Sequence, residues 1–276
     1  MEIRPILSAM LRNKTGAVLI ALQIAFTLAV VANALFIIYQ RWEKIERPTG
    51  IDTENIVAFS SQWVGQNVNY AEAIREDLRV LSQLPGVIAV TPAQSIPLSG
   101  GGSGRGLGTE PGDDAERVSA GFFYLDHNAI KTLGVNLVEG RDFRADDELW
   151  RETLSNDHPA SIIISQALAD QLFPDGGALG KTVHLPEASF TVIGIIEQMH
   201  GSWVNWDGLE RTVILPIVDA SSSYYRYMIR VEPGQMNQLI PQIEETLLAI
   251  NSRRVIGRTR TLAEYAERSY QDDSAM

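Results

Sequence analysis

The sequence predicts an α+β protein: one N-terminal transmembrane helix, then a mixed α/β extracytoplasmic domain of βαβ-like units in two subdomains. Three observations predict this class. An apolar run covers residues 16–39, residues 48–276 have ordinary mixed composition, and strand-like and helix-like patterns alternate along them. The first observation sets the membrane topology, and the other two set the architecture of the folded part.

The apolar run contains no charged side chain, and Gln23, Thr27 and Asn33 are its only clearly polar members. At about 1.5 Å of rise per residue it is roughly 36 Å long, which is enough to cross a hydrocarbon core of about 30 Å. The three polar side chains either face other helices or are tolerated in a single span. Residues 16–39 are therefore predicted to be a transmembrane helix.

The charges that flank the run predict a cytoplasmic N-terminus, because short segments rich in Lys and Arg stay in the cytoplasm. Arg4, Arg12 and Lys14 precede the run, against Glu2 alone. Apolar residues before the run recur at spacings of three and four, so we expect residues 1–15 to form a cytoplasmic amphipathic segment. The large domain then lies in the periplasm of an inner-membrane protein.

A cleavable signal peptide is the competing interpretation of the same run. Ala32-Asn33-Ala34 resembles a small-residue cleavage site that follows a basic start. The apolar stretch continues beyond this site through Tyr39, which makes it longer than the usual hydrophobic region of a signal. We favour the membrane anchor.

Composition limits the functions open to the folded part. Residues 48–276 carry 17 Lys and Arg against 31 Asp and Glu, a net charge of −14. Such a surface repels nucleic acid, so we expect no nucleic-acid partner. The chain has no cysteine, which excludes a disulfide scaffold, a thiolate nucleophile and a cysteine-ligated metal.

Local patterns place the secondary structure of the folded part. Apolar stretches bounded by turn residues predict strands at 55–60, 87–90, 117–123, 162–164, 182–185, 190–196, 213–215 and 227–231. Apolar spacings of three and four predict helices at 70–84, 125–133, 166–173 and 236–250. Residues 144–159 are polar and acidic, and we expect them to form an excursion on the surface.

Two glycine-rich stretches invite a nucleotide-binding interpretation and fail it. Residues 99–108 fit neither the Walker pattern nor a GxGxxG frame, so a mobile loop is favoured. Residues 175–182 end in Gly180-Lys181-Thr182, but Asp175 stands where the Walker pattern needs glycine, and a strand follows in place of a helix. We interpret this stretch as a connection between a helix and a strand, and we expect no nucleotide cofactor.

The remaining candidate side chains do not form a catalytic or metal-binding pattern. Four histidines lack paired ligand spacing, the acidic clusters are typical of solvated turns with weak cation binding as the minor alternative, and a tryptophan pair either touches a partner or packs on the preceding strand. These are His127, His158, His184 and His200, then Asp113-Asp114 and Asp146-Asp147-Glu148, and finally Trp203 and Trp206. We therefore expect no catalytic, cofactor-binding or metal-binding residues, and we do not expect an enzyme.

A series of short strings, taken in their order along the chain, is similar to strings found in a known family. The strings are Met10-Leu11-Arg12-Asn13, Gly121-Phe122-Phe123, Leu133-Gly134-Val135, Glu139 to Phe143, Ile162 to Ala169, Leu172-Phe173-Pro174, Leu179-Gly180-Lys181, Thr191 to Ile196, Arg260-Thr261-Leu262 and Ser269-Tyr270. Together they resemble MacB-like ABC transporter permeases, in the first span and the periplasmic core domain. No single string is diagnostic, and the resemblance lies in their order along the chain.

The resemblance implies a permease subunit that works with an ABC-type ATPase in the cytoplasm. ATP-driven motion would then operate the periplasmic domain, for efflux through an adaptor protein or for signalling in the envelope by mechanotransmission. A homodimer or a heterodimer with another permease is also implied. Length and the resemblance together suggest subdomains of residues 48–120 with 220–276, and of residues 121–219.

The family pattern has four spans, whereas this sequence reaches Met276 with one apolar run. We therefore expect the chain to be the N-terminal portion of such a permease. The alternative is a single-span, membrane-anchored sensor or a module that binds a ligand or a partner. Transport substrate and partner identity lie beyond what the residues indicate.

Overall fold

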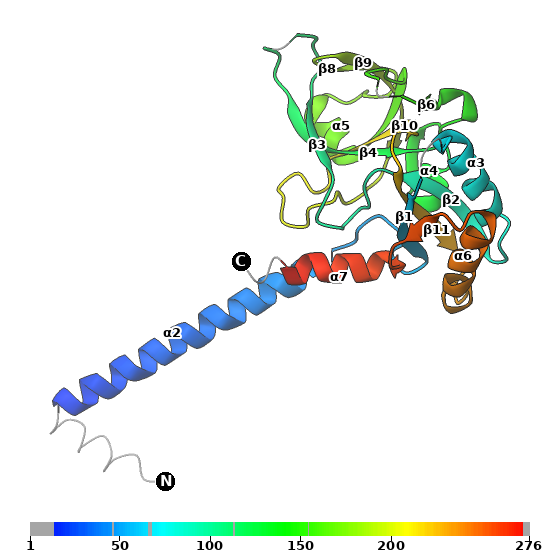
Figure 1. Cartoon of the computed structure of the whole chain (residues 1–276). Helices are drawn as coiled ribbons and strands as arrows, with labels where there is room; N and C mark the ends of the chain where they lie inside the picture. Colours follow the sequence, from blue (N-terminus) through cyan, green and yellow to red (C-terminus); the bar gives the residue numbers. More distant parts are fainter. Residues whose placement is uncertain (1–13, 46, 66–67, 113, 154, 273–276) are drawn as a thin grey trace. The chain divides into compact units, whose positions relative to one another are not determined.

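The computed structural model describes residues 14–45, 47–65, 68–112, 114–153 and 155–272 (Figure 1). The chain divides into two compact units, Met1–Pro48 and Thr49–Met276. Most of the predicted amphipathic segment, residues 1–13, lies outside the described residues. The second unit is the mixed α/β domain that the sequence predicts.

The described part of the first unit is dominated by one helix, α2, Lys14–Ile45. Its segment Lys14–Gln40 has a mean hydropathy of 2.3 and is long and apolar enough to cross a membrane. The Thr27 hydroxyl donates a 2.8 Å hydrogen bond to the Gln23 carbonyl oxygen one turn earlier. This polar group is thus satisfied within the helix.

The first sheet of the folded domain has the strand order β12-β1-β11-β2, and β13 extends the β12 edge by pairing with β1. Its strands are β1 (Ile56–Trp63), β2 (Val87–Ala93), β11 (Tyr224–Val231), β12 (Arg254–Ile256) and β13 (Arg260–Thr261). Its helices are α3 (Tyr70–Leu81), α6 (Met236–Ile250) and α7 (Leu262–Asp272). β11 lies between β1 and β2 and is antiparallel to both, so the units β1-α3-β2 and β11-α6-β12 are split βαβ units.

Alternate residues of β1 enter different cores, because successive side chains of a strand point to opposite faces. Val57 and Phe59 pack with α3 and α6 on one face. Ile56 and Ala58 pack on the other face, against residues of the second sheet and of its short helix. The first sheet is therefore buried on both faces.

The second sheet is inserted between β2 and β11 and has the order β3-β4-β10-β7-β9-β5, with β6 beside β10 and β8 beside β9. Its strands are β3 (Ser103–Leu107), β4 (Val118–Leu125), β5 (Leu137–Gly140), β6 (Leu149–Arg151), β7 (Ser161–Ser165), β8 (Thr182–Leu185), β9 (Ala188–Ile196) and β10 (Thr212–Asp219). Its helices are α4 (Ala129–Leu133), α5 (Gln166–Leu172) and the 3-10 turn η1 (Ala145–Asp147). Parallel and antiparallel pairs alternate, which makes this a mixed sheet.

The glycine-rich stretch corrects one expectation, because residues 103–107 form strand β3 and pair with β4. The glycines alternate with larger residues and leave room for close neighbours. A Cβ at Gly104 would lie 3.4 Å from the Trp203 ring, and one at Gly106 would lie 2.9 Å from Arg117 Cβ. Glycine here permits close approach within a strand, so this part of the stretch is not a loop.

The polar excursion at residues 144–159 is also partly ordered into the sheet. Leu149–Arg151 form β6, which pairs in parallel with Ile217–Asp219 of β10. The strand is short and its side chains are only half-buried, so its sequence carries almost no apolar alternation. The predicted surface excursion thus contains one short strand that pairs with the sheet.

The chain passes from the first sheet to the second between Ala93 and Ser103, and it returns to the first sheet between Asp219 and Tyr224. β3 and the start of β4 thus belong to the second sheet, although the expected subdomain boundary at residue 120 groups them with the first. Residues 49–276 form one compact unit, and the division into two subdomains stays a prediction.

Candidate functional site

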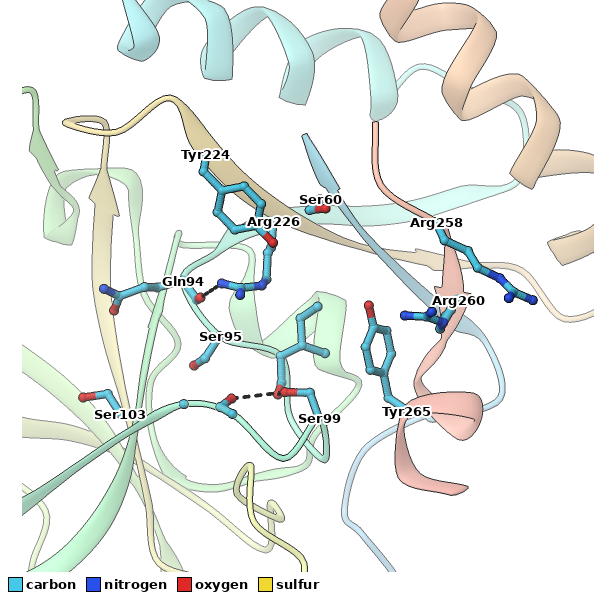
Figure 2. Close-up of a pocket in the computed structure, with 13 residues that line it drawn as sticks. Ser60, Gln94, Ser95, Ser99, Ser103, Tyr224, Arg226, Arg258, Arg260 and Tyr265 are labelled. Carbon is cyan, nitrogen blue, oxygen red and sulfur yellow. Dashed lines mark hydrogen bonds between the residues drawn. The ribbon is translucent and has the colours of Figure 1, made fainter. Parts of the chain in front are cut away.

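A cleft of about 620 Å³ opens where β11, β13 and α7 meet the segment between β2 and β3 (Figure 2). We call it the arginine-lined cleft. It is lined by Ser60, Gln94, Ser95, Ile96, Ser99, Gly101, Gly102, Ser103, Tyr224, Arg226, Arg258, Arg260 and Tyr265. Its volume falls within the range of small-molecule sites, roughly 300–1,000 Å³.

Three arginines give the cleft its charge, and two of them point into it. Figure 2 shows the guanidinium groups of Arg226 and Arg260 turned towards the space, whereas that of Arg258 extends outward at the rim. Arg226 is held by a hydrogen bond to the Gln94 carbonyl oxygen and stands 4.9 Å from the centre of the Tyr224 ring. Arg260 stands 5.8 Å from the centre of the Tyr265 ring. Aromatic faces thus orient both cations without neutralising them.

No carboxylate neutralises these arginines among the described residues. The described lining of the cleft contains no Asp or Glu, and Arg226, Arg258 and Arg260 form no ion pair with a described side chain. Two other arginines near the same sheet are paired, Arg230 with Asp52 at 3.0 Å and Arg254 with Asp77 at 2.8 Å. The cleft is therefore a cationic hollow in a domain of strongly negative charge.

Two hydrogen-bonding groups in the cleft wall are buried without a protein partner. Ser95 is 7% exposed, and its hydroxyl oxygen makes no hydrogen bond to a described residue. The Arg260 Nε atom is likewise buried and without an acceptor. An unsatisfied buried polar group costs about 1–3 kcal/mol, so such groups are usually retained where a ligand or water completes them.

The backbone of residues 98–102 forms one wall of the cleft and is held in place by hydrogen bonds. The Leu98 N–H donates to Gly201 O at 3.0 Å, and the Gly100 N–H donates to Ser202 O at 2.8 Å. Leu98 is buried with φ of 60°, and no other described residue except glycine has a positive φ. Strain of this kind costs about 1–3 kcal/mol and commonly accompanies functional sites. Gly102 lies so close to Ser202 that an added Cβ would come within 2.4 Å of its hydroxyl oxygen.

The arrangement suits one kind of chemistry, the binding of an oxyanion. A guanidinium presents a fixed fork of N–H donors that matches a carboxylate or a phosphate, and serine hydroxyls add further donors. The described lining contains no histidine, carboxylate or lysine, so it offers no general acid or base with a pKa near neutrality. The lining would therefore suit binding of an anion rather than acid–base chemistry.

A second cluster of titratable groups lies in the other part of the domain. One ligating atom each from Asp126, His127 and Glu148 lies within 4.8 Å of the other two. Burial, together with the nearby charge of Glu148, raises the pKa of Asp126 to about 6. The His127 ring contacts Glu148, and the Trp150 indole N–H donates to the same carboxylate at 3.0 Å. Glu148 is therefore a partly buried hydrogen-bonding centre, which corrects its interpretation as part of a solvated turn.

The other histidines and the tryptophan pair have local partners. His184 Nδ1 lies 2.8 Å from the Ser189 hydroxyl, and His158 packs edge-on against Phe190. His200 is fully buried. Trp203 and Trp206 pack edge to face at 6.0 Å, both are half-buried, and the Trp203 ring lies against Gly104 of β3.

The stretch that mimics a phosphate loop connects α5 to β8. Gly176, Gly177 and Gly180 have φ values of 82°, 74° and 77°, and the Gly180 N–H donates to Val192 O at 2.8 Å. Strand β8 follows at once, so no helix N-terminus converges on a phosphate. The segment is thus a connection between a helix and a strand, as the sequence predicts.

The residues of the arginine-lined cleft were missed by sequence reasoning because they come from distant parts of the chain. Residue 60 lies on β1 and residue 265 on α7, and no local spacing relates them. One signal was readable, since the alternation of glycine from Gly102 to Gly108 is typical of a strand with one bare face.

The sequence profile of the MacB-like periplasmic core domain matches residues 18–246. The chain belongs to this family. The match covers most of the apolar helix and most of the folded domain, and it agrees with the resemblance drawn from the ordered strings. An apolar N-terminal helix ahead of a domain of this family indicates a membrane-anchored protein with a periplasmic domain.

Solved structures of transporter and permease domains are similar to the chain. The periplasmic region of MacB from Actinobacillus actinomycetemcomitans has 16% identity and a TM-score of 0.47, covering 83% of this chain and 98% of that one. The extracellular domain of the noncanonic ABC-type transporter YknZ from Gram-positive bacteria has 14% identity and a TM-score of 0.45, covering 73% and 100%. A domain of a putative permease from Porphyromonas gingivalis has 17% identity and a TM-score of 0.41, covering 76% and 91%. A search of curated proteins gave no match.

Proposed function

We propose that this MacB-like chain is the N-terminal portion of an ABC transporter permease. Its periplasmic domain would move in response to ATP hydrolysis by a partner ATPase, for export or for signalling in the envelope. The family match over residues 18–246 is the observation that carries the proposal. We also propose that the chain is not itself an enzyme and that catalysis belongs to the ATPase.

The proposed orientation places the N-terminus in the cytoplasm. Arg4, Arg12 and Lys14 lie on the N-terminal side of the apolar run, and positive charge in short flanking segments favours the cytoplasmic side. The folded domain has a charge balance that suits neither nucleic acid nor an anionic membrane surface. The interaction partners that we propose are therefore proteins: the ATPase, a periplasmic adaptor and a second permease.

The segment that follows the apolar helix is firmly tied into the folded domain, which supports a mechanical role. Thr49 O accepts a 2.9 Å hydrogen bond from the His200 N–H, and the Asp52 N–H donates to Leu133 O at 3.1 Å. The Asp52 carboxylate pairs with Arg230 of β11 at 3.0 Å. Residues 49–52 thus contact β11 of the first sheet, and the helix α4 and the segment after β9 beside the second sheet, so a displacement of these residues would reach both parts of the domain.

Helix α7, which follows the last strand of the first sheet, contacts the chain just after residues 49–52. The Ala263 N–H of α7 donates to Thr53 O at 3.3 Å, and Leu262 is fully buried in the core shared by both sheets. In the proposed permease, α7 is the segment that approaches the next span. Both routes towards the membrane would then join the domain at one place, which suits transmission of motion.

Gly50 offers a test of this joint. Its φ is 75°, and an added Cβ would lie 2.1 Å from Gln198 O, so Gly50→Ala adds a backbone clash to the strain. Gly176→Ala is the matched control, because Gly176 has φ of 82° and nothing within 4 Å of an added Cβ. We expect Gly176→Ala to cost about 1 kcal/mol of unfolding free energy and Gly50→Ala to cost at least about 2 kcal/mol more. Equal losses in urea unfolding would contradict a rigid joint.

The functional test uses the chain in its native membrane context. The native permease should copurify with an ABC-type ATPase and change its rate of ATP hydrolysis in detergent or nanodiscs. Gly50→Ala should reduce this change, whereas Gly176→Ala should preserve it. A permease that neither associates with such an ATPase nor alters its turnover would overturn the proposal.

The arginine-lined cleft favours a second candidate, a membrane-anchored module that senses or binds a ligand. Its concave shape and unpaired cations are features of a small-molecule site. An experiment can distinguish the permease from the sensor, because a sensor would bind its ligand without any effect on the rate of ATP hydrolysis by an ATPase.

A further inference from the structure

We propose that the arginine-lined cleft binds a small molecule through an oxyanion group, a phosphate or a carboxylate, held between Arg226 and Arg260. This inference goes beyond the permease role and does not depend on it. It follows from the unpaired charge, the donors and the shape of the cleft.

The charge argument rests on what surrounds the two guanidinium groups. Both point into the space in Figure 2, and neither forms an ion pair with a described carboxylate. Residues 48–276 carry 31 Asp and Glu, so carboxylate partners are plentiful in the chain. Arginines left without such partners inside a hollow favour an anion from outside the chain.

The donor argument extends the site beyond the arginines. The Ser95 hydroxyl is buried at the cleft wall without a partner, and Arg260 Nε is buried without an acceptor. One bound oxyanion has enough lone pairs to accept from several donors at once. The groups that the fold leaves unsatisfied are thus the donors that an oxyanion needs.

The shape argument favours a small molecule over an acidic segment of a partner protein. The cleft holds about 620 Å³ and has walls from β1, β11, β13, α7 and the segment before β3. Tyr224 and Tyr265 add aromatic surface that could pack on an apolar or planar part of the ligand. A protein partner would be expected to use a broad, flatter surface of about 800 Å².

The test measures thermal unfolding of the full chain in a non-ionic detergent with phosphate or citrate, against chloride at matched ionic strength. We expect both oxyanions to stabilise the folded domain, since a ligand that binds only the folded state raises the unfolding temperature. Arg226→Gln and Arg260→Gln should each weaken the apparent affinity about tenfold, because a charge-assisted hydrogen bond is lost. Arg253→Gln is the control, an exposed arginine outside the cleft.

Ser95→Ala separates a ligand role from a structural one. The hydroxyl has no described partner to lose, so the protein without ligand should be as stable as the wild type or slightly more stable. Its oxyanion affinity should nevertheless fall several-fold. Equal affinity in Ser95→Ala and the wild type would remove Ser95 from the site.

Two further probes identify the source of the oxyanion. Glycerol 3-phosphate represents a free metabolite, and dihexanoyl-phosphatidylglycerol below its micelle-forming concentration represents a lipid headgroup. Tighter binding of the second, dependent on Arg226 and Arg260, would assign the cleft to lipid. Oxyanion stabilisation that is the same in the wild type and in the Arg226→Gln/Arg260→Gln double variant would overturn the proposal, as would tighter binding of tetraglutamate than of every small oxyanion.

Discussion

Arg254 and Arg260 lie six positions apart on the same edge of β1, yet their surroundings are opposite. Arg254 on β12 is buried, and its guanidinium contacts both carboxylate oxygens of Asp77 at 2.8 and 2.9 Å. Arg260 on β13 lines an open cleft and forms no ion pair with a described carboxylate. One edge of β1 thus carries both a buried ion pair and an arginine that lines an open cleft.

The buried pair is part of a three-residue network that joins three elements. Asp77 on α3 also accepts a 2.9 Å hydrogen bond from the Tyr227 hydroxyl of β11. Burial raises the pKa of Asp77 above its ordinary value, although the hydrogen bonds from Arg254 and Tyr227 act in the opposite direction. The network therefore fixes how α3 lies on the sheet, at a desolvation cost that its hydrogen bonds offset only in part.

The largest expected effect comes from breaking this pair. Asp77→Ala or Arg254→Ala should each lower the unfolding free energy by about 3–5 kcal/mol, because an uncompensated buried charge remains. The apolar variant Asp77→Leu/Tyr227→Phe/Arg254→Met, which removes every member, should lose much less. The measurement is urea unfolding of the full chain in detergent, followed by circular dichroism. A loss below about 1 kcal/mol in both single variants would refute a structural role for the pair.

A half-exposed pair should give an intermediate effect that depends on pH. The Arg141 guanidinium, through its hydrogen bonds, lowers the pKa of Asp147 to about 2. Because the pKa is lower in the folded state, the stabilisation is present above about pH 4 and is lost as the pH falls towards 2. We expect about 1–2 kcal/mol of stability to disappear over this window, discounted for the 40% exposure of Arg141.

Arg141→Gln provides the control for this pH dependence. It should lower stability at neutral pH and flatten the curve of stability against pH between about 4 and 2. A curve that keeps its wild-type slope in this variant would show that other carboxylates cause the acid sensitivity.

The smallest effect is expected at the cleft. Arg260→Gln should change the unfolding free energy of the ligand-free chain by less than about 1 kcal/mol, since no buried carboxylate loses its partner. Urea unfolding beside Arg254→Gln gives a matched comparison of the same substitution at both arginines. A loss as large as that of Arg254→Gln would mean that Arg260 is structural and would weaken the contrast on which the binding site depends.

Strong apolar periodicity allowed much of the fold to be predicted. The helix at 236–250 and the strand at 182–185 have the predicted bounds, and the helix from Tyr70 ends within one turn of its predicted end. The core-facing residues of these elements repeat at the period of their backbone, so local sequence carries the information. The βαβ-like units that the sequence predicts are present in the first sheet as split βαβ units.

Three of the missed strands lack that periodic signal. β12 and β13 are two or three residues long and begin with arginine, and β3 alternates glycine with other residues. Such strands form because neighbouring strands supply their hydrogen bonds and because bare glycine faces admit Trp203 and Arg117. The cleft could not be predicted for the same reason, since the pairing of β13 with β1 brings Arg260 into place.

The most direct test of the central claim, a membrane-anchored protein with its folded domain in the periplasm, uses the absence of cysteine from the chain. Single cysteines are introduced by Ser8→Cys and by Asp175→Cys, the latter at an exposed residue of the folded domain. Whole cells are then treated with a membrane-impermeant maleimide. The account predicts labelling of Asp175→Cys in intact cells and of Ser8→Cys only after lysis. Labelling of Ser8→Cys alone in intact cells, or protection of Asp175→Cys, would contradict it.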